Sequence, residues 1–303
     1  MKPLSGLTVL VLGGNGMLGH VVVGTLAQNH LRTVATLRGS ADEQPALKHF
    51  LHGAEIIGGM DAFAPDRLES EIRRLRPDVI VNCIGMIKQK PGSENALETI
   101  ALNTTLPHRL VEIANSIHAR IIQISTDCVF SGKAGNYTEA DLPDPPDFYG
   151  RSKLLGEIGA PHLTLRTSLI GWQIHGNESL LNWFWQQRGK AIAGYKNAIF
   201  SGLTCEAFAL ILFDVIREFP RLDGVWHVAS KPISKFELLK RLNERLGRPV
   251  EITADSNLRL DRSLNGQRFA EQTRIETPDW GTMLDEIVVR RKEYDDYGPE
   301  ALG

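Results

Sequence analysis

The sequence predicts an α/β fold: a doubly wound parallel sheet followed by a smaller C-terminal lobe. Through the first 170 residues, short runs rich in Val, Ile and Leu alternate with segments of helical periodicity. Nearly unbroken apolar strands are typical of a parallel sheet that helices cover on both faces. The first run ends at a cluster of glycines, and the alternation loosens after residue 170. A chain of 303 residues has room for both parts.

The first part is expected to contain six strands with helices between them. Apolar runs predict the strands, at residues 7–12, 32–37, 55–57, 78–84, 120–126 and 162–166. Helical spacing predicts the helices, at residues 17–27, 46–51, 67–75, 97–118 and 149–158. The helix at 97–118 should be interrupted at Pro107, because proline lacks the N–H that a helix interior needs. This order of elements is that of a doubly wound sheet.

Beyond residue 170 the pattern is less regular. Helices are expected at residues 178–188, 205–219 and 236–246, and Ser234 with Glu237 forms a capping box before the last one. Residues 224–229 read as a strand that rejoins the main sheet. From about residue 250, including a polar tail at 290–303, we expect a smaller, irregular lobe. The predicted division is a first domain of residues 1–170, to which about 197–230 return, and a lobe of residues 171–196 and 231–303.

Composition places the chain among ordinary globular proteins. Apolar residues make up 42% and charged residues 23%, which excludes collagen-like, low-complexity and disordered chains. The formal net charge of -2 gives no excess that would draw the chain onto nucleic acid or anionic lipid. We therefore expect neither a nucleic-acid nor a membrane partner, and any anionic ligand must be bound locally.

The cysteines and the first apolar run indicate a cytoplasmic protein. Cys83, Cys128 and Cys205 lie far apart, each in an apolar run, and are read as reduced, mostly buried thiols. The apolar stretch at 7–12 is too short to span a membrane and leads into glycines rather than into a cleavage site. The nine histidines are scattered without ligand spacing, so no metal site is inferred.

Glycines between the first strand and the first helix predict a phosphate-binding turn. Gly13, Gly16 and Gly19 recur at every third position, and a turn without Cβ atoms lets backbone N–H groups approach a pyrophosphate. A merely structural tight turn is the alternative. The flanking strand and helix favour a dinucleotide site of the Rossmann type, whose expected contacts are Gly13, Asn15, Gly16, Met17, Leu18 and Gly19.

The end of the second strand favours NADPH as the cofactor, with NADH held open. An Asp or Glu there would bind the ribose 2′-hydroxyl of NAD, whereas this chain has Arg38 and Ser40, and an arginine can pair with a 2′-phosphate. A solvated Arg38 is the alternative. Asp61, after the third strand, is either an adenine contact or a helix N-cap.

Tyr149 and Lys153 are four residues apart on one face of a predicted helix. A tyrosine normally loses its proton near pH 10, and a neighbouring ammonium favours the ionised form, so we expect Lys153 to lower the pKa of Tyr149. The plain alternative is an exposed pair on a surface helix. Thr126 ends a predicted strand at the sheet edge where ligands bind, which favours a site: Thr126 would bond to a substrate carbonyl and Tyr149 would supply the proton.

These motifs together resemble an extended short-chain dehydrogenase/reductase, most similar to the dTDP-4-dehydrorhamnose reductase group. The similarity covers most of the first 170 residues and continues loosely to about residue 265. It is carried by the glycine turn, residues 82–85, Asn103, residues 125–130, Tyr149, Lys153 and residues 165–168.

The resemblance implies an enzyme in which Thr126, Tyr149 and Lys153 are the catalytic residues. It implies that Asn103 supports the lysine and that cofactor contacts include Asn82, Cys83, Ile84, Gly85, Asn103, Ser125, Lys153, Arg166 and Thr167. The implied reaction is hydride transfer from NADPH to the C4 ketone of a nucleotide-linked 4-keto-6-deoxy sugar, for surface polysaccharide or other deoxysugar synthesis.

The expected substrate contacts are less specific. Lys88 and Arg262 can pair with phosphates, although solvated side chains or surface salt bridges explain them too. The other expected substrate contacts are Thr126, Asp127, Tyr149, Asn182 and Arg259. The partner is a nucleotide sugar, and a homodimer is held open.

Differences from the group's sequence pattern reduce the number of activities that we expect for this chain. Dehydratases that resemble this chain need a Glu where it has Cys128, so a dehydratase is not expected. A nucleotide-sugar epimerase stays open, as does a non-catalytic NADP-binding regulatory subunit like that of methionine adenosyltransferase. Residues 84–89 and 260–264 resemble reductases of UDP-linked 2-acetamido-6-deoxy sugars, so the base and the C2 substituent are also open.

Overall fold

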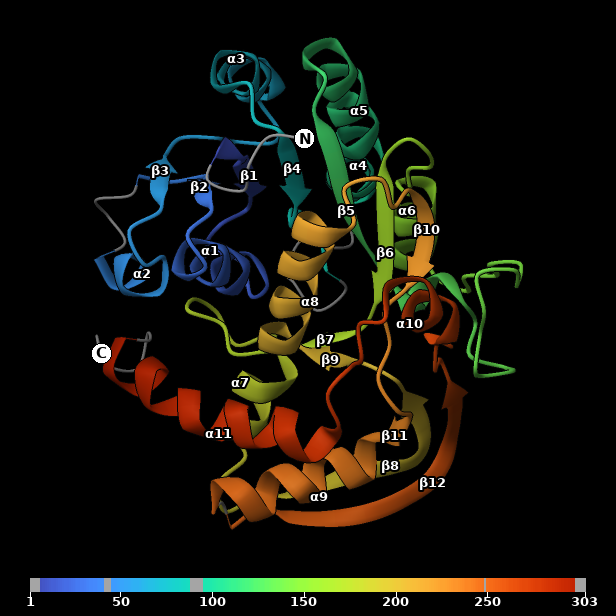
Figure 1. Cartoon of the computed structure of the whole chain (residues 1–303). Helices are drawn as coiled ribbons and strands as arrows, with labels where there is room; N and C mark the ends of the chain where they lie inside the picture. Colours follow the sequence, from blue (N-terminus) through green and yellow to red (C-terminus); the bar gives the residue numbers. More distant parts are fainter. Residues whose placement is uncertain (1–5, 41–44, 88–94, 248, 298–303) are drawn as a thin grey trace.

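The computed structural model describes residues 6–40, 45–87, 95–247 and 249–297. Its main feature is a seven-stranded parallel sheet in the order β10-β6-β5-β4-β1-β2-β3 (Figure 1). The strands are β1 (Thr8–Leu12), β2 (Arg32–Thr36), β3 (Glu55–Ile57), β4 (Val79–Asn82), β5 (Arg120–Thr126), β6 (Leu163–Thr167) and β10 (Gly224–His227). The strand order reverses between β1 and β4, where open α/β sheets bind their ligands. The predicted fold class and the return of residues 224–229 to the sheet are confirmed.

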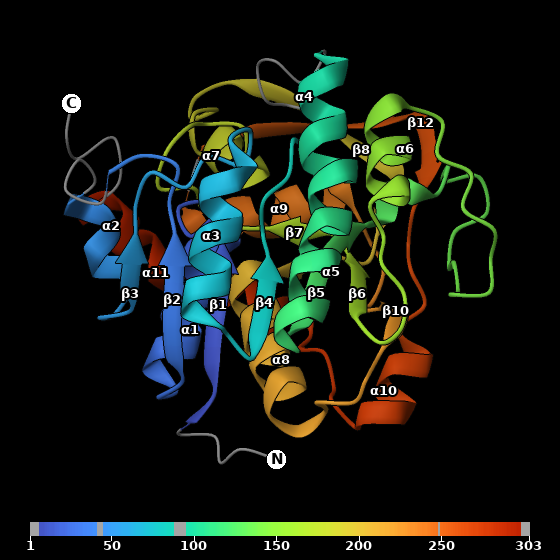
Figure 2. The same ribbon diagram turned by 90° about the horizontal axis from the view of Figure 1, so that it is seen from above.

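Apolar side chains on both faces of the sheet explain why its strands read as unbroken apolar runs. Leu10 and Leu12 of β1 pack toward α3 (Pro65–Leu75) and α5 (Leu106–Ile117). Val9 and Val11 point the other way, toward α1 (Gly19–Gln28) and α8 (Cys205–Glu218). Figure 2 shows α3, α5 and α6 (Phe148–Leu155) on one side of the sheet and α1 and α8 on the other.

The helix predicted at residues 97–118 contains an unexpected π-helical turn. It is made of α4 (Ala96–Ile100), the π turn η2 (Ala101–Thr105) and α5. The predicted break at Pro107 is wrong, because this proline lies in the first turn of α5, where its missing N–H leaves no bond unmade. The irregularity instead comes just before it, and places Asn103 inside the protein, 1% exposed.

The C-terminal lobe is more regular than the sequence indicates. Its three-stranded sheet has the order β11 (Ile233–Ser234), β8 (Ala191–Phe200) and β12 (Glu251–Asp261), covered by α9 (Lys235–Leu246). The expectation of an irregular lobe from residue 250 is wrong, because β12 pairs with β8 over most of its length. Every β12 residue is exposed or half-buried, so no apolar run marks this strand. The remaining elements are β7 (Leu169–Ile170), β9 (Leu203–Thr204), α2 (Pro45–Phe50), α7 (Leu180–Trp185) and α10 (Gln267–Thr273).

The last helix connects the lobe to the main sheet. The polar tail expected from residue 290 is helical as far as residue 297, within α11 (Trp280–Tyr297). This helix contacts α9 near its start and also packs on α2 and α8, as Figure 1 shows. The strand β8 crosses the division predicted between residues 196 and 197. The lobe and the sheet domain are therefore joined more closely than the predicted division suggests.

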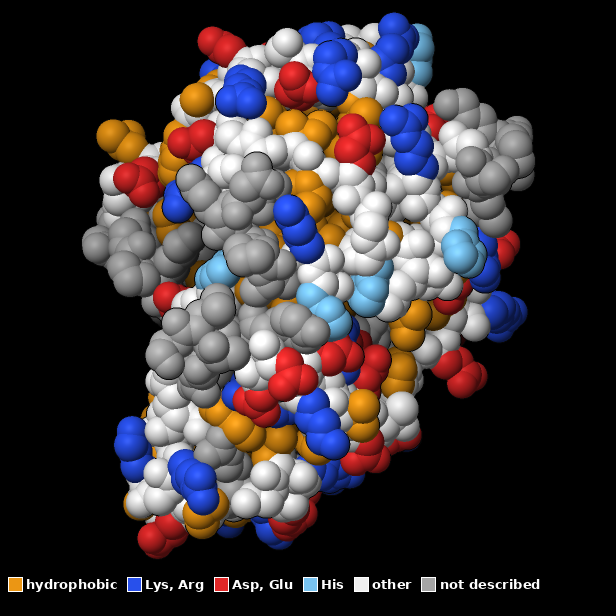
Figure 3. Space-filling model, turned by 90° about the vertical axis from the view of Figure 1, so that its left-hand side faces the viewer, with side chains coloured by type: hydrophobic (Ala, Val, Ile, Leu, Met, Phe, Trp, Pro, Cys, Tyr) orange, Lys and Arg blue, Asp and Glu red, His pale blue; other side chains and the backbone are white. Residues whose placement is uncertain are grey.

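The surface charge, the helices and the thiols bear on the expected partners and location. On the face in Figure 3, basic and acidic side chains are interspersed. Among the described residues, no helix is both long and apolar enough to cross a membrane. The three cysteines are free thiols, as predicted, but only Cys205 is fully buried.

Candidate active site

The turn between β1 and α1 has no room for Cβ atoms at several of its glycines, as the binding of a pyrophosphate requires. Gly13 has a φ of +79°, which favours glycine. A Cβ on Gly19 would collide with the Gly13 carbonyl, and one on Gly14 would lie 2.9 Å from the Ala35 Cβ. The turn thus meets the steric condition for close approach of a dinucleotide to the N-terminus of α1.

The loops after β2 and β3 lie next to each other at the same sheet edge. The Met60 N–H donates to the Leu37 carbonyl at 2.8 Å. Arg38 is exposed there, as a 2′-phosphate ligand must be. Asp61 is not an N-cap, because its Oδ1 accepts from the Phe63 N–H at 3.0 Å in a turn before α3, whose N-cap is Ala64. Contacts of Arg38, Ser40 or Asp61 with a cofactor stay predictions.

Asn82 shapes the loop that leaves β4. It is 1% exposed and donates from Nδ2 to Gln123 on β5 at 2.8 Å. Its Oδ1 accepts from the Ile84 N–H at 3.1 Å, which turns the chain at Cys83. Burial raises the pKa of the Cys83 thiol to about 12, so this cysteine is neutral at physiological pH. The loop therefore presents neutral groups beside the glycine turn.

Asn103, on the π turn, joins this loop to α6. Its Oδ1 accepts from the Met86 N–H at 2.8 Å, and its Nδ2 donates to Ser152 Oγ at 3.0 Å. A Cβ on Gly85 would lie 3.2 Å from Asn103 Oδ1 and 3.8 Å from Lys153 Nζ. Asn103, Gly85 and Lys153 thus come together, and Asn103 fixes the backbone around the lysine.

Tyr149 and Lys153, the two predicted proton-transfer residues, both lie on α6. Their pKa values differ from those expected from the sequence. Lys153 is buried, and its Nζ donates to the Ile124 carbonyl at 2.8 Å. Burial lowers the pKa of Lys153 to about 8. The pKa of Tyr149 is raised, first by burial and then by Cys128, so the expected lowering by Lys153 is wrong. Tyr149 therefore holds its proton firmly at neutral pH.

Thr126 connects Tyr149 to a buried carboxylate. It ends β5, and its hydroxyl accepts from the Cys128 N–H at 3.1 Å at the start of the short helix η3 (Asp127–Val129). The same hydroxyl donates to Asp127 Oδ1 at 3.2 Å and is also hydrogen-bonded to the Tyr149 side chain. The bond to Thr126 favours the ionised form of Tyr149, but burial outweighs this effect.

Ser125 and Arg166 belong to a buried network around Glu157, a carboxylate that also interacts electrostatically with Lys153. Ser125 Oγ donates to Glu157 Oε1 at 2.6 Å, and Arg166 forms an ion pair with Glu157 at 2.7 Å. Arg166 also reaches His227, which is fully buried. Cofactor contacts of Ser125 and Arg166 stay predictions. Thr167 is buried at the end of β6 and its cofactor contact stays a prediction.

Three substrate residues were predicted in the lobe, and the structure brings one of them, Arg262, to the segment that follows β5. Arg262 donates to the Phe130 carbonyl at 3.0 Å and to Cys128 Sγ at 3.4 Å. Asn182 instead holds its own loop, where it accepts from the Gln173 N–H at 2.9 Å. Arg259 is exposed on β12, and Lys88 lies outside the described residues.

Lys235 is a candidate site residue that the sequence analysis missed. It begins α9, directly after the N-cap Ser234, and its Nζ lies 3.6 Å from the centroid of the Phe200 ring. It interacts electrostatically with Asp127 and Cys128. Burial raises the pKa of Asp127, while Lys235 and then Arg262 lower it. No local pattern could mark Lys235, because its position depends on how the lobe docks.

Within residues 6–40, 45–87, 95–247 and 249–297, no three or more His, Cys, Asp or Glu side chains form a group that could hold a metal ion.

The glycine turn, the parallel sheet and the Thr126, Tyr149 and Lys153 arrangement define an extended short-chain dehydrogenase/reductase fold. The chain belongs to the RmlD substrate binding domain family, whose model matches residues 7–290.

Individual relatives match over part of the chain. It is 31% identical to the probable low-salt glycan biosynthesis reductase Agl14 of Haloferax volcanii, over 53% of this chain and 52% of that protein. It is 32% identical to methionine adenosyltransferase 2 subunit beta of Mus musculus, over 49% of this chain and 41% of that protein. The chain thus spans about half the length, or less, of these relatives.

Solved structures of related proteins match nearly the whole chain. One of them is that of a hypothetical dTDP-4-dehydrorhamnose reductase from Sulfolobus tokodaii, with a TM-score of 0.73 and 27% identity. The match covers 90% of this chain and 98% of that one. The similarity thus includes the lobe as well as the sheet.

Proposed function

We propose that the protein is an NADPH-dependent reductase of the C4 ketone of a nucleotide-linked 4-keto-6-deoxy sugar. The observation that carries this proposal is the placement of Thr126, Tyr149 and Lys153 together at the carboxyl edge of β5. That edge adjoins the loop after β4 and so the turn suited to a dinucleotide. The related reductases support the reaction class.

The residues present fit a bound NADPH, with NADH as the alternative. Gly13, Gly14 and Gly19 would receive the pyrophosphate, and Arg38 would pair with the 2′-phosphate. When bound, the cofactor supplies the hydride. Lys153 lies beside Gly85, where its ammonium can exchange the Ile124 carbonyl for a ribose hydroxyl.

Tyr149 is suited to act as the acid of the reduction. Because its pKa is raised, it is protonated at neutral pH and can give its proton to the oxygen of the reduced ketone. Lys153, with a pKa of about 8, remains mostly protonated at pH 7 and can donate hydrogen bonds to the cofactor.

The substrate side of the site is cationic. Arg262 and Lys235 approach Cys128 and Asp127 from the lobe, and Lys88 is predicted to add a third cation. Such groups suit the diphosphate and oxygen-rich sugar of a nucleotide sugar. Cys128 occupies the position at which a dehydratase would need a carboxylate. The next experiment decides between a dTDP-linked sugar and a UDP-linked sugar that carries a 2-acetamido group.

The deciding experiment follows NADPH consumption with dTDP-4-keto-6-deoxy-L-mannose and with its UDP-2-acetamido counterpart, each generated in situ. The wild type should turn over one of them, and Tyr149→Phe should lose about 10²- to 10⁴-fold in rate while binding NADPH as before. Turnover without net NADPH consumption would identify an epimerase instead.

The similarity to methionine adenosyltransferase 2 subunit beta favours a second candidate, a non-catalytic dinucleotide-binding subunit. In that case neither substrate is turned over, NADPH still binds, and Tyr149→Phe behaves like the wild type in both measurements. We propose a cytoplasmic location, which the three free thiols support. A homodimer is the proposed oligomeric state, to be tested by light scattering.

A further inference from the structure

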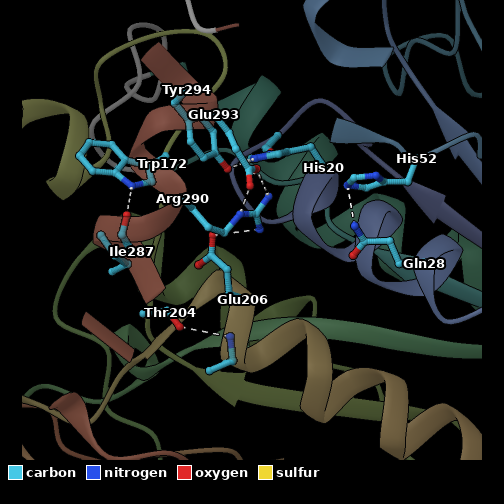
Figure 4. Close-up of polar contacts among 12 residues, drawn as sticks. His20, Gln28, His52, Trp172, Thr204, Glu206, Ile287, Arg290, Glu293 and Tyr294 are labelled. Atoms are coloured by element: carbon cyan, nitrogen blue, oxygen red, sulfur yellow. Dashed lines mark hydrogen bonds and ion pairs between the residues drawn. The ribbon is translucent and has the colours of Figure 1, made fainter. Parts of the chain in front are cut away.

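His20 joins the phosphate-binding turn to the C-terminal helix. Its ring is 0% exposed, on the first turn of α1 directly after Gly19. Nδ1 lies 2.7 Å from the Gly16 carbonyl oxygen, and Nε2 lies 2.6 Å from the Tyr294 hydroxyl. Figure 4 shows His20 and Tyr294 facing each other from α1 and α11.

The partners of His20 decide which nitrogen carries the proton. A carbonyl oxygen only accepts, so Nδ1 is protonated and donates to Gly16. Burial lowers the pKa of His20 to about 4, which leaves Nε2 free to accept from Tyr294. The backbone N–H of His20 also donates to the Gly16 carbonyl, at 3.2 Å. Two donors therefore orient that carbonyl, and with it the peptide plane between Gly16 and Met17.

Tyr294 is itself held firmly on α11. Its ring, 2% exposed, lies 4.7 Å from the Phe50 ring between centroids. One turn earlier, Arg290 forms an ion pair with the buried Glu206 at the start of α8, at 3.3 Å. The helix is thus attached to the sheet domain at two points, seen together in Figure 4. Tyr294 lies beyond residues 7–290, which the family model matches.

We propose that Tyr294 and His20 are positioning residues for the dinucleotide: α11 holds the Gly16 carbonyl inward, so that the N–H groups of the turn face the pyrophosphate. This inference rests on the proposed function in one respect, that the ligand of the turn is a dinucleotide. Tyr294 and His20 themselves lie behind the turn and need not touch the ligand.

Tyr294→Phe tests the link, because it removes the hydroxyl and keeps the ring that packs on Phe50. We expect the Kd for NADPH, measured by titration calorimetry, to rise three- to tenfold. The matched control is Trp280→Phe, at the other end of α11, which loses a partly buried bond from Trp280 Nε1 to the Lys231 carbonyl at 2.7 Å. In the control we expect the melting temperature to fall and the Kd to stay within twofold.

Hydrogen exchange of residues 13–20 in the unliganded protein tests the same link without any cofactor. Exchange should be faster in Tyr294→Phe and unchanged in Trp280→Phe. An unchanged exchange rate and Kd in Tyr294→Phe would overturn the inference, as would equal effects in both variants. If the wild type binds neither NADPH nor NADH, the proposed function fails, while faster exchange in Tyr294→Phe still shows that α11 orders the turn.

Discussion

The Thr126 hydroxyl donates to Asp127 Oδ1 at 3.2 Å, so a proposed catalytic residue depends on the charge of a buried carboxylate. Asp127 is 6% exposed, and burial favours its neutral form. Lys235 and Arg262, both from the C-terminal lobe, favour the ionised form. The lobe therefore supplies charges that keep Thr126 oriented, in addition to any contact with the substrate.

Lys235→Met should shift the pH dependence of the reaction. Loss of the ammonium removes a group that lowers the pKa of Asp127, so that pKa rises and the carboxylate becomes protonated at higher pH. The rate should then begin to fall at a higher pH on the acid side, as measured by kcat between pH 5 and 9 at saturating substrate. Lys235→Arg should restore the wild-type profile. A Lys235→Met profile that overlays the wild type would show that Asp127 does not depend on this cation.

Gly19→Ala should remove most dinucleotide affinity. A Cβ at this position meets the Gly13 backbone carbonyl, so α1 must move away from the turn. We expect the Kd for NADPH to rise about tenfold or more, because backbone approach to the pyrophosphate depends on this packing. Gly159→Ala is the control, since a Cβ there meets no atom within 4 Å. Equal affinity in the two variants would contradict a tight turn as the binding feature.

Arg166→Met should destabilise the protein through the loss of a buried ion pair. It leaves Glu157 buried without its ion-pair partner, and breaking such a pair costs about 3 to 5 kcal/mol. Urea denaturation should show this loss in the free energy of unfolding. Arg241→Met is the control, because its pair with Glu237 is about two-fifths exposed and should contribute less than about 1 kcal/mol. Similar losses in both variants would mean that the buried pair is no more important than a surface one.

Local sequence patterns predicted the sheet well because its strands are buried on both faces. Every residue of β1 is buried, and its bounds are within one residue of the prediction. All of β12 is exposed or half-buried, so the same apolar pattern could not find it. The motif residues Thr126, Tyr149 and Lys153 were found because they lie on elements that follow one another in the chain.

Residues that depend on distant contacts were missed. Lys235 reaches Asp127 only because the lobe docks on the loop after β5, and His20 meets Tyr294 across 274 positions of sequence. Neither pair leaves a periodic or spaced signal in the chain. For the same reason the ion pair of Arg166 with Glu157 was not predicted, because Glu157 lies on a separate segment and could not be paired with Arg166 from spacing alone.

Glu206→Gln should change how stability depends on pH. Glu206 is 3% exposed, and burial raises its pKa from 4.5 to about 7 despite the nearby Arg290. Between pH 4.5 and 7 the folded state thus binds more protons than the unfolded state, so this carboxyl makes the protein less stable as the pH rises. Above pH 7 the loss in the free energy of unfolding caused by Glu206 should reach about 3 kcal/mol, because each pKa unit is worth about 1.4 kcal/mol.

The measurement is the free energy of unfolding of wild type and Glu206→Gln from pH 4.5 to 8. The difference between the two should change across this range and level off above pH 7, because a neutral amide does not titrate. Glu293→Gln, on the exposed side of the same Arg290 guanidinium, is the control and should follow the wild-type dependence more closely. A constant difference between Glu206→Gln and wild type would mean that Glu206 is ionised throughout, and that its pair with Arg290 outweighs its burial.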